Sequence, residues 1–477
     1  MTAFGATTFA VALVVGAATI LIGWRRPFLM LAVLLLGVPL RDFVTRWFLV
    51  RDVASVEAVT ALGRWWFVLI LALLGVVALQ WLLQWRRQKP RFRPDGLDLL
   101  LVAIVLWGAV ETLISPSRAA GFTSLRGYLQ PIGVFLIARE LRPSPKALRT
   151  LLVAWLALGA LMAAFGLLQG ATWTEETYRA EGYVRQDGSL VVPPTTVRGQ
   201  VFIRPASTVS GPNELGVDMV LLTTLAVLAV PGVRPMGRVA LGVLAAVFTL
   251  MLGVTFSRSA MLAYLAAWAA MGLLAISLRR RNSAPASKPR WIILGGALAA
   301  VVLIAFALVR LGAFSVLAST ITNLTSEFHY VDTVAAIQHL IANPGGVGMG
   351  MVEPKGAISL IEMGGLYHVE GSLFQITEEM GVWGLGLWLL FWGLALVRVY
   401  RAWPGLKDTS LRTFAGAAFA GGLGSLVAFV FLPLMQSISL MVWLWFLLAV
   451  AVAAHRIEAT WASAAKASPT VAPAAAV

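Results

Sequence analysis

Three arginines lie at the edges of apolar segments, where a charged side chain is costly unless it has a function. Arg126 is expected to open a helix, Arg204 precedes the polar segment 211–216, and Arg258 separates two apolar helices. A guanidinium stays charged at any biological pH, and its planar fork matches two phosphate oxygens. We therefore predict that these arginines bind a diphosphate group. The alternative is that they reach for the membrane interface or pair with an acid such as Glu214.

A candidate general base lies before the last apolar segments of the chain. His368 and Glu370 stand where the chain re-enters an apolar helix, and a neutral imidazole or a carboxylate there could accept a proton from an incoming hydroxyl. The alternative is a helix N-terminus at which Glu370 only complements the helix dipole. We include Asn213, Glu214 and His329 as supporting residues of the predicted site.

The composition requires a membrane to position these residues. Hydrophobic residues make up 59% of the 477 residues and charged residues only 12%, whereas a soluble domain carries about 25% charge. In hydrocarbon every backbone polar group must be paired internally, and the long uninterrupted apolar runs favour helices over a barrel. The chain has no cysteine, which excludes disulfides and Cys-ligated metals. The net charge of +15 is explained by basic cytoplasmic loops, so we do not expect nucleic-acid binding.

Hydropathy predicts an all-α polytopic transmembrane bundle of about 12–13 helices. The predicted helices cover residues 6–23, 27–40, 65–85, 97–115, 125–139, 148–168, 213–231, 239–256, 259–278, 291–310, 373–397, 412–432 and 437–454. This pattern divides the chain into N-terminal helices (1–168), a loop (169–212), central helices (213–310), a large loop (311–372), C-terminal helices (373–455) and a disordered tail (456–477).

Lysine and arginine are concentrated in alternate loops, which we assign to the cytoplasm together with the C-terminal tail. The loops 169–212 and 311–372 then lie outside, and so does the predicted site. In the second loop, residues 330–342 have helical spacing but are too short to span a membrane, so we expect a surface helix. It should end at the turn Asn343-Pro344-Gly345-Gly346.

Four short motifs resemble those of the bacterial O-antigen ligase and O-antigen polymerase family of membrane glycosyltransferases. They are an arginine followed by Gly-Pro-Asn-Glu-Leu-Gly (204 and 211–216), Phe-Ser-Arg-Ser-Ala (256–260), Asn-Pro-Gly-Gly-Val-Gly-Met-Gly (343–350) and Glu-Met-Gly-Val-Trp-Gly (379–384). Each motif is short, but the order and spacing of the four are more specific, and the resemblance covers most of the chain in layout.

The resemblance implies a GT-C-like helical fold and a glycan donor linked to undecaprenyl diphosphate. The reaction would take place on the periplasmic face of the cytoplasmic (inner) membrane without a metal or other cofactor, and Arg204 and Arg258 would bind the diphosphate. The acceptor would be another lipid-linked glycan or a lipid A-core, and polysaccharide-assembly proteins would be possible partners. A transporter of lipid-linked sugars is the main alternative, although it would favour internal repeats and charges at the membrane midplane. A structural role in an assembly complex is a third reading.

Overall fold

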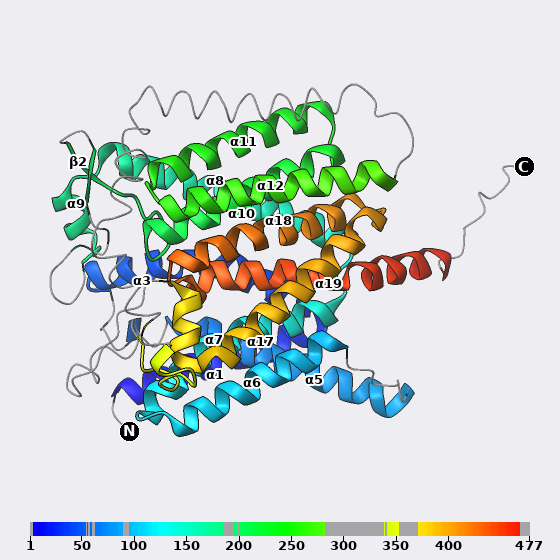
Figure 1. Cartoon of the computed structure of the whole chain (residues 1–477), viewed down its shortest axis with the longest axis horizontal. Helices are drawn as coiled ribbons and strands as arrows, with labels where there is room; N and C mark the ends of the chain where they lie inside the picture. Colours follow the sequence, from blue (N-terminus) through cyan, green and yellow to red (C-terminus); the bar gives the residue numbers. More distant parts are fainter. Residues whose placement is uncertain are drawn as a thin grey trace, which may run out of the picture.

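The protein is a bundle of long helices whose axes run roughly along one direction (Figure 1). The computed structural model describes residues 3–53, 55, 58–59, 63–88, 95–184, 190, 192, 194–197, 200–281, 338, 341–352 and 371–467. Nearly all of the elements in these residues are helices, so the predicted all-α polytopic bundle is confirmed.

In the N-terminal half of the bundle, the described residues form seven long or medium helices and one short one. They are α1 (Ala3–Arg25), α2 (Pro27–Gly37), α3 (Arg41–Val50), α5 (Trp65–Gln88), α6 (Gly96–Ile114), α7 (Arg118–Leu141), α8 (Pro145–Thr172) and α9 (Glu175–Ala180). A single turn, η1 (Val38–Leu40), joins α2 to α3. A two-stranded antiparallel hairpin follows α9 and consists of β1 (Pro194–Val197) and β2 (Gln200–Ile203).

The C-terminal half supplies the most buried helices. It contains α10 (Pro212–Ala229), η2 (Val230–Gly232), α11 (Pro235–Val254), α12 (Arg258–Arg281), α17 (Ser372–Ala402), η4 (Trp403–Gly405), α18 (Thr409–Phe431), η5 (Leu434–Gln436) and α19 (Ile438–Ala467). Small residues let these helices approach closely, as is common between membrane helices. A Cβ on Gly424 of α18, for example, would lie 2.6 Å from the backbone oxygen of Ala263 in α12.

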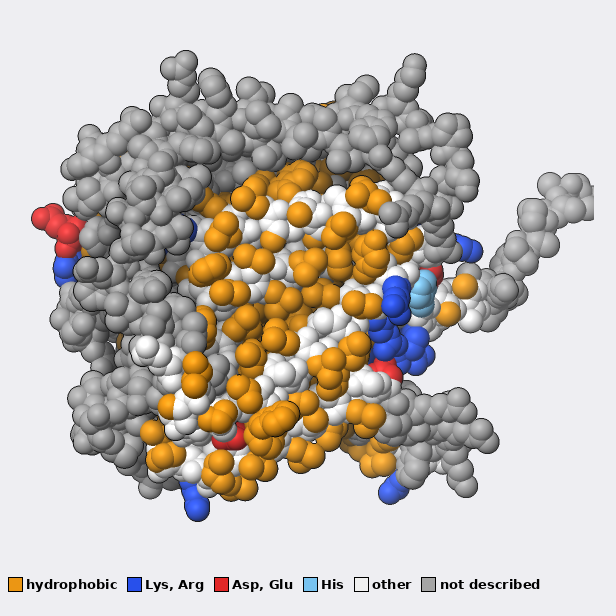
Figure 2. Space-filling view, in the orientation of Figure 1, with side chains coloured by type: hydrophobic (Ala, Val, Ile, Leu, Met, Phe, Trp, Pro, Cys, Tyr) orange, Lys and Arg blue, Asp and Glu red, His pale blue; other side chains and the backbone are white. Residues whose placement is uncertain are grey.

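Ten helical segments of the described chain are long and apolar enough to cross a membrane. Large apolar side chains cover the outside of the bundle, and in Figure 2 they form a broad band across its middle. A surface of this kind is stable in lipid rather than in water. The molecule is therefore a multi-pass membrane protein.

The two ends of the bundle differ in character. We call the end at which α5, α7, α10, α12, α17 and α19 begin the loop end, because α3, α9 and the hairpin lie there (Figure 1, left). The opposite end is the basic end, where lysine and arginine side chains gather in Figure 2. From α5 to α12 the long helices of the described chain alternate in direction between the two ends (Figure 1).

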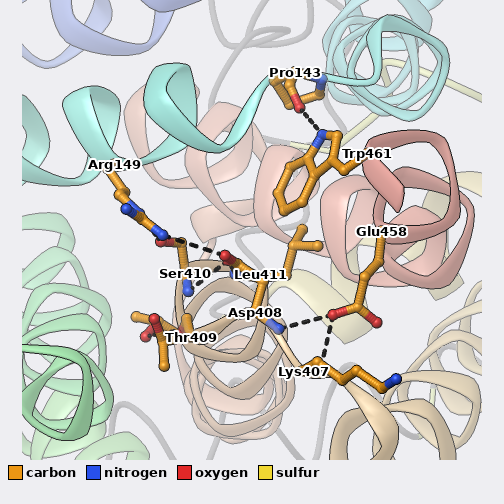
Figure 3. Close-up of polar contacts among 10 residues, drawn as sticks. Pro143, Arg149, Lys407, Asp408, Thr409, Ser410, Leu411, Glu458 and Trp461 are labelled. Carbon is orange, nitrogen blue, oxygen red and sulfur yellow. Dashed lines mark hydrogen bonds and ion pairs between the residues drawn. The ribbon is translucent and has the colours of Figure 1, made fainter. Parts of the chain in front are cut away.

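Polar contacts at the basic end tie three helices together. In Figure 3, the Arg149 side chain of α8 points to Ser410 and to Asp408, which caps α18. Glu458 of α19 accepts hydrogen bonds from the backbone N–H groups of Lys407 and Asp408, each at 2.7 Å. Some arginines at this end have acidic partners, as in the Arg139–Asp98 and Arg398–Asp95 ion pairs.

Every predicted helix that lies in the described residues is present, with shifted ends. The predicted helix 291–310 lies outside these residues, as does most of the predicted surface helix 330–342. Helix α7 begins at Arg118 and not near residue 125, so the expectation that Arg126 opens a helix is wrong. Helix α3 was not predicted, and α19 continues to Ala467 through the start of the predicted tail.

Candidate functional site

Arg204 is held at the loop end by two elements. It follows β2 directly, and its Nε donates a hydrogen bond to the backbone oxygen of Thr255 at 2.7 Å. One of its terminal nitrogens donates to Oδ1 of Asn213 at 2.6 Å. A guanidinium has five N–H donors. The other three have no partner in the described part of the chain and could bind a ligand.

Arg258 lies close to Arg204. It is the first residue of α12, three positions after Thr255, and its side chain is exposed. Burial lowers the pKa of Arg204 to about 10, and the nearby positive charge of Arg258 contributes to this shift. A cation at a helix N-terminus also opposes the helix dipole. Two cations thus lie together at a place that electrostatics disfavours.

Neither arginine forms an ion pair with a carboxylate among the described residues. Two acids of the loop end have other partners: Glu181 pairs with Arg51, and Glu175 pairs with Arg179. Glu214, the acid proposed from the sequence as an alternative partner, accepts hydrogen bonds from three serines instead. The positive charge of the two arginines is therefore not neutralised by any described side chain.

The backbone beside the arginine pair is strained. Phe256, between Thr255 and Arg258, has a φ of 48°, and Ser207, just after Arg204, has a φ of 52°. Side chains other than glycine rarely adopt this left-handed region, and such residues persist where the surroundings hold them. Ser207 is held in this way, because its N–H donates to Gln169 at 2.7 Å and its hydroxyl donates to the Met162 carbonyl at 2.6 Å.

A small aromatic cluster supports the loop that carries Arg204. Tyr178, Tyr183 and Trp173 pack edge to face around Ala206. The Tyr183 hydroxyl donates to the Ser207 carbonyl at 2.7 Å and accepts a hydrogen bond from Gln169. Burial raises the pKa of Tyr183, so this hydroxyl keeps its proton. The segment between β2 and α10 is thereby fixed to α8.

The glycine-rich motif 343–350 and the motif 379–384 also contact each other at the loop end. Gly381 interrupts α17 with a φ of 66°, and a Cβ at this position would lie 2.6 Å from the carbonyl of Gly345. The turn predicted at 343–346 is present, and Gly346 donates to Asn343 at 3.0 Å. The break in α17 frees the N–H of Val382, which donates to Pro344 at 3.0 Å. The glycines of the two motifs are thus needed where the two backbones approach.

A buried carboxylate completes this contact. Glu379 accepts hydrogen bonds from the Ser124 hydroxyl at 2.8 Å, the Tyr128 hydroxyl at 2.7 Å and the Gly350 N–H at 3.1 Å. It therefore joins α7, the glycine turn and α17. Sequence reasoning identified Glu379 only as part of a motif, because its partners lie more than 250 positions away or on a loop.

A short chain of hydrogen bonds links α17, which carries the motif 379–384, to α10, which carries most of the motif 211–216. Ser372, at the start of α17, donates to the Leu432 carbonyl at 2.8 Å and accepts from the Met435 N–H at 2.8 Å. Two residues further on, Ser437 donates to Glu214 at the start of α10. The turn η5 thus connects the beginnings of α17 and α10.

The structure brings together only some of the predicted site residues. Arg204, Arg258 and Asn213 form one cluster, and Glu214 lies next to it in sequence. Arg126 belongs to a different place, because its guanidinium lies 5.5 Å from the ring centroid of Phe67 on α5. The predicted residues His329, His368 and Glu370 lie outside the described residues.

Comparison with known proteins adds no assignment. No family model matches the chain, and no curated protein matches it. Within the described part of the chain, no three His, Asp or Glu side chains gather so that they could hold a metal ion.

Proposed function

We propose that the protein is a membrane glycosyltransferase that moves or polymerises a glycan carried on undecaprenyl diphosphate. The observation that supports this most directly is the arginine pair, Arg204 and Arg258, which lies at one end of a membrane bundle without an acidic partner in the described chain. A lipid diphosphate presents its anionic group at the depth where membrane helices begin, and arginine is well suited to bind it.

The geometry suggests separate roles for the residues of the pair. Asn213 and the Thr255 carbonyl fix the orientation of Arg204, so its remaining N–H groups have a defined direction. Arg258 is exposed and is free to close on the second phosphate. Both charges would stabilise the diphosphate as it leaves, which is commonly the largest catalytic effect in reactions of this type.

The reaction would be a single displacement with inversion. The acceptor hydroxyl oxygen forms a bond to the anomeric carbon, the bond from that carbon to the diphosphate oxygen breaks, and the hydroxyl proton passes to a base. His368 or Glu370 remains our proposal for the base. The residues that follow them, Gly371 and Ser372, lie at the loop end beside η5.

The charge distribution supports an orientation in the membrane. Basic residues gather at the end opposite the arginine pair, and such an end usually faces the cytoplasm. The proposed site then faces the periplasm or exterior of a bacterial cytoplasmic membrane, with the C-terminus inside. The acceptor distinguishes the two members of the class: a lipid-linked glycan for an O-antigen polymerase, and a lipid A-core for an O-antigen ligase of lipopolysaccharide biosynthesis.

The test uses purified protein in liposomes with a lipid-linked repeat unit. We expect longer or transferred glycans together with free undecaprenyl diphosphate, and we expect Arg258→Ala to reduce kcat about 10²–10³-fold. Arg118→Ala is the matched control, because Arg118 is also exposed and is also the first residue of a helix at the loop end. Equal rates for both variants would refute the role of the pair. Movement of intact lipid across the bilayer without bond cleavage would instead identify a transporter.

A further inference from the structure

A cavity of about 420 Å³ opens at the loop end beside the arginine pair. It lies between η1 and α3, the segment before α10, and the start of α19. Its volume falls within the range of about 300–1,000 Å³ that is usual for small-molecule sites. Its polar lining comes from Arg41, Asp42, Thr45, Arg46, Ser210, Glu214, Ser437 and Ser439. None of the roles proposed above uses this cavity.

One wall of the cavity is basic and is held in place. Arg46 donates to the Val209 carbonyl at 3.0 Å, and its guanidinium carbon lies 4.0 Å from the centroid of the Tyr183 ring. The Nε atoms of Arg41 and Arg46 are both buried and have no hydrogen-bond partner in the described chain. An unsatisfied buried donor costs about 1–3 kcal/mol. The Nε atoms are not accessible from the cavity, so the donors that this wall can offer to a ligand are the terminal N–H groups of the two guanidinium groups.

The opposite wall is rich in oxygen atoms. Glu214 accepts hydrogen bonds from Ser210, Ser437 and Ser439, and Ser439 also lies 3.2 Å from the carboxylate of the buried Asp218. Asp42 lies beside Arg41, with 3.6 Å between the carboxylate and Nε. Two arginines and two carboxylates thus line the cavity, so its charge is close to balanced.

This lining differs from that of the arginine pair and fits a different ligand. A phosphate would favour a site with cations alone. Sugar hydroxyls both donate and accept, so they match a cavity that has arginine donors on one side and carboxylate and serine oxygens on the other. Val38, Pro39 and Ile438 add apolar surface to the lining.

The cavity is also in the right place relative to the arginine pair. Consecutive residues of an α-helix point about 100° apart, because a turn contains 3.6 residues. At the start of α10, Asn213 turns toward Arg204, and Glu214 turns toward the cavity. A molecule bound across this helix start could place its diphosphate on one side and its sugars on the other.

We propose that this cavity binds sugar residues of the lipid-linked glycan. The inference rests on the proposed function, because it assigns the glycan part of the same substrate. It adds Arg41, Arg46, Asp42 and Glu214 as the residues that contact the sugars. Sequence reasoning included Glu214 only as a supporting residue and did not single out the others.

The absence of cysteine provides a clean test. Thr45 is half-buried and lines the cavity. Among the described residues, its hydroxyl bonds only to the Arg41 carbonyl of its own helix, so Thr45→Cys is a mild change. The variant in detergent micelles is labelled with a maleimide alone, with undecaprenyl diphosphate, or with the undecaprenyl-diphosphate-linked glycan. Glu176→Cys, on exposed α9 away from the cavity, is the control.

We expect the glycan-bearing lipid to slow labelling of Thr45→Cys several-fold, with no effect of the bare carrier and no effect on Glu176→Cys. Equal protection by the bare carrier would overturn the inference, because the cavity would then hold the diphosphate. Absence of protection in a preparation whose turnover depends on Arg258 would overturn it and leave the function intact. Protection without any bond cleavage would support the cavity and reject the transferase.

Discussion

In the Arg204→Lys variant, we expect the cationic group at this position to lose its proton within the pH range of the assay, which the wild-type arginine does not do. Burial, aided by the Arg258 charge, lowers the pKa of Arg204 from its ordinary value to about 10. The wild-type guanidinium therefore stays charged over the whole range in which the protein can be assayed. A lysine amine has an ordinary pKa of roughly 10.4, and the same lowering would bring it to roughly 8.

The sign of the effect follows from the charge that the diphosphate needs. The lysine is protonated and competent below its pKa and becomes neutral as the pH rises through it. The ratio of variant to wild-type kcat/KM, which reports groups of the free enzyme, should therefore fall about tenfold between about pH 6.5 and 9. Taking the ratio removes the titration of the general base, which both proteins share.

The assay is release of undecaprenyl diphosphate from a lipid-linked glycan at low substrate concentration. Arg118→Lys is the control, because that exposed side chain lies outside the pair and should give a ratio independent of pH. A flat ratio for Arg204→Lys across this range would refute the reasoning. It would mean either that the position is not desolvated or that its charge does not contribute to binding.

Two further predictions concern the contact between α17 and the glycine turn, and both are measured by thermal unfolding followed through intrinsic tryptophan fluorescence. Gly381→Ala should lower stability by more than the roughly 1–3 kcal/mol of a residue in a sparsely populated backbone region, because its Cβ also meets the Gly345 carbonyl at 2.6 Å. Gly386→Ala on the same helix has open space at the Cβ. Equal unfolding midpoints for the two variants would therefore contradict the close backbone contact between Gly381 and Gly345. Tyr128→Phe should cost about 1.5–3 kcal/mol through its lost bond to the Glu379 carboxylate. The Tyr400 hydroxyl has no hydrogen-bond partner in the described part of the chain, so Tyr400→Phe should unfold like the wild type. An unchanged Tyr128→Phe would show that the bond to Glu379 adds nothing to stability.

The sequence predicts the helices of this protein well because an apolar run long enough to cross a bilayer has few other solutions. It places helix ends less well, and α7 shows the reason. Its first turns contain Arg118, Ser124 and Arg126, which lower the local hydropathy. The helix is nevertheless continuous there, because Ser124 and Tyr128 are bonded to Glu379 from α17. Contacts between distant segments decide this boundary, and they cannot be read from a local window.

The same distinction separates the two halves of the candidate site. Arg204 and Arg258 could be predicted because a permanent charge beside an apolar helix is unusual on its own. That the two arginines lie close together could be inferred only from the topology. In the structure, the hydrogen bond from Arg204 to the Thr255 carbonyl brings them together. The cavity could not be found in this way. Its walls come from α3 and the start of α19, and the local sequence of Arg41, Arg46 and Ser439 is typical of an ordinary helix end.

Several local features at the arginine pair work against stability, and their coincidence is itself an argument for a ligand. Arg258 opposes the dipole of its own helix, Arg204 is desolvated beside a like charge, and Phe256 occupies a left-handed conformation. Charged residues at the basic end instead include paired and capping side chains, such as Arg139 with Asp98 and Asp408 at the start of α18. In most proteins the local backbone preferences, the packing and the charges favour the same structure, and departures occur mainly at functional sites. An anion bound between the two guanidinium groups would offset the repulsion between them, which no described side chain does.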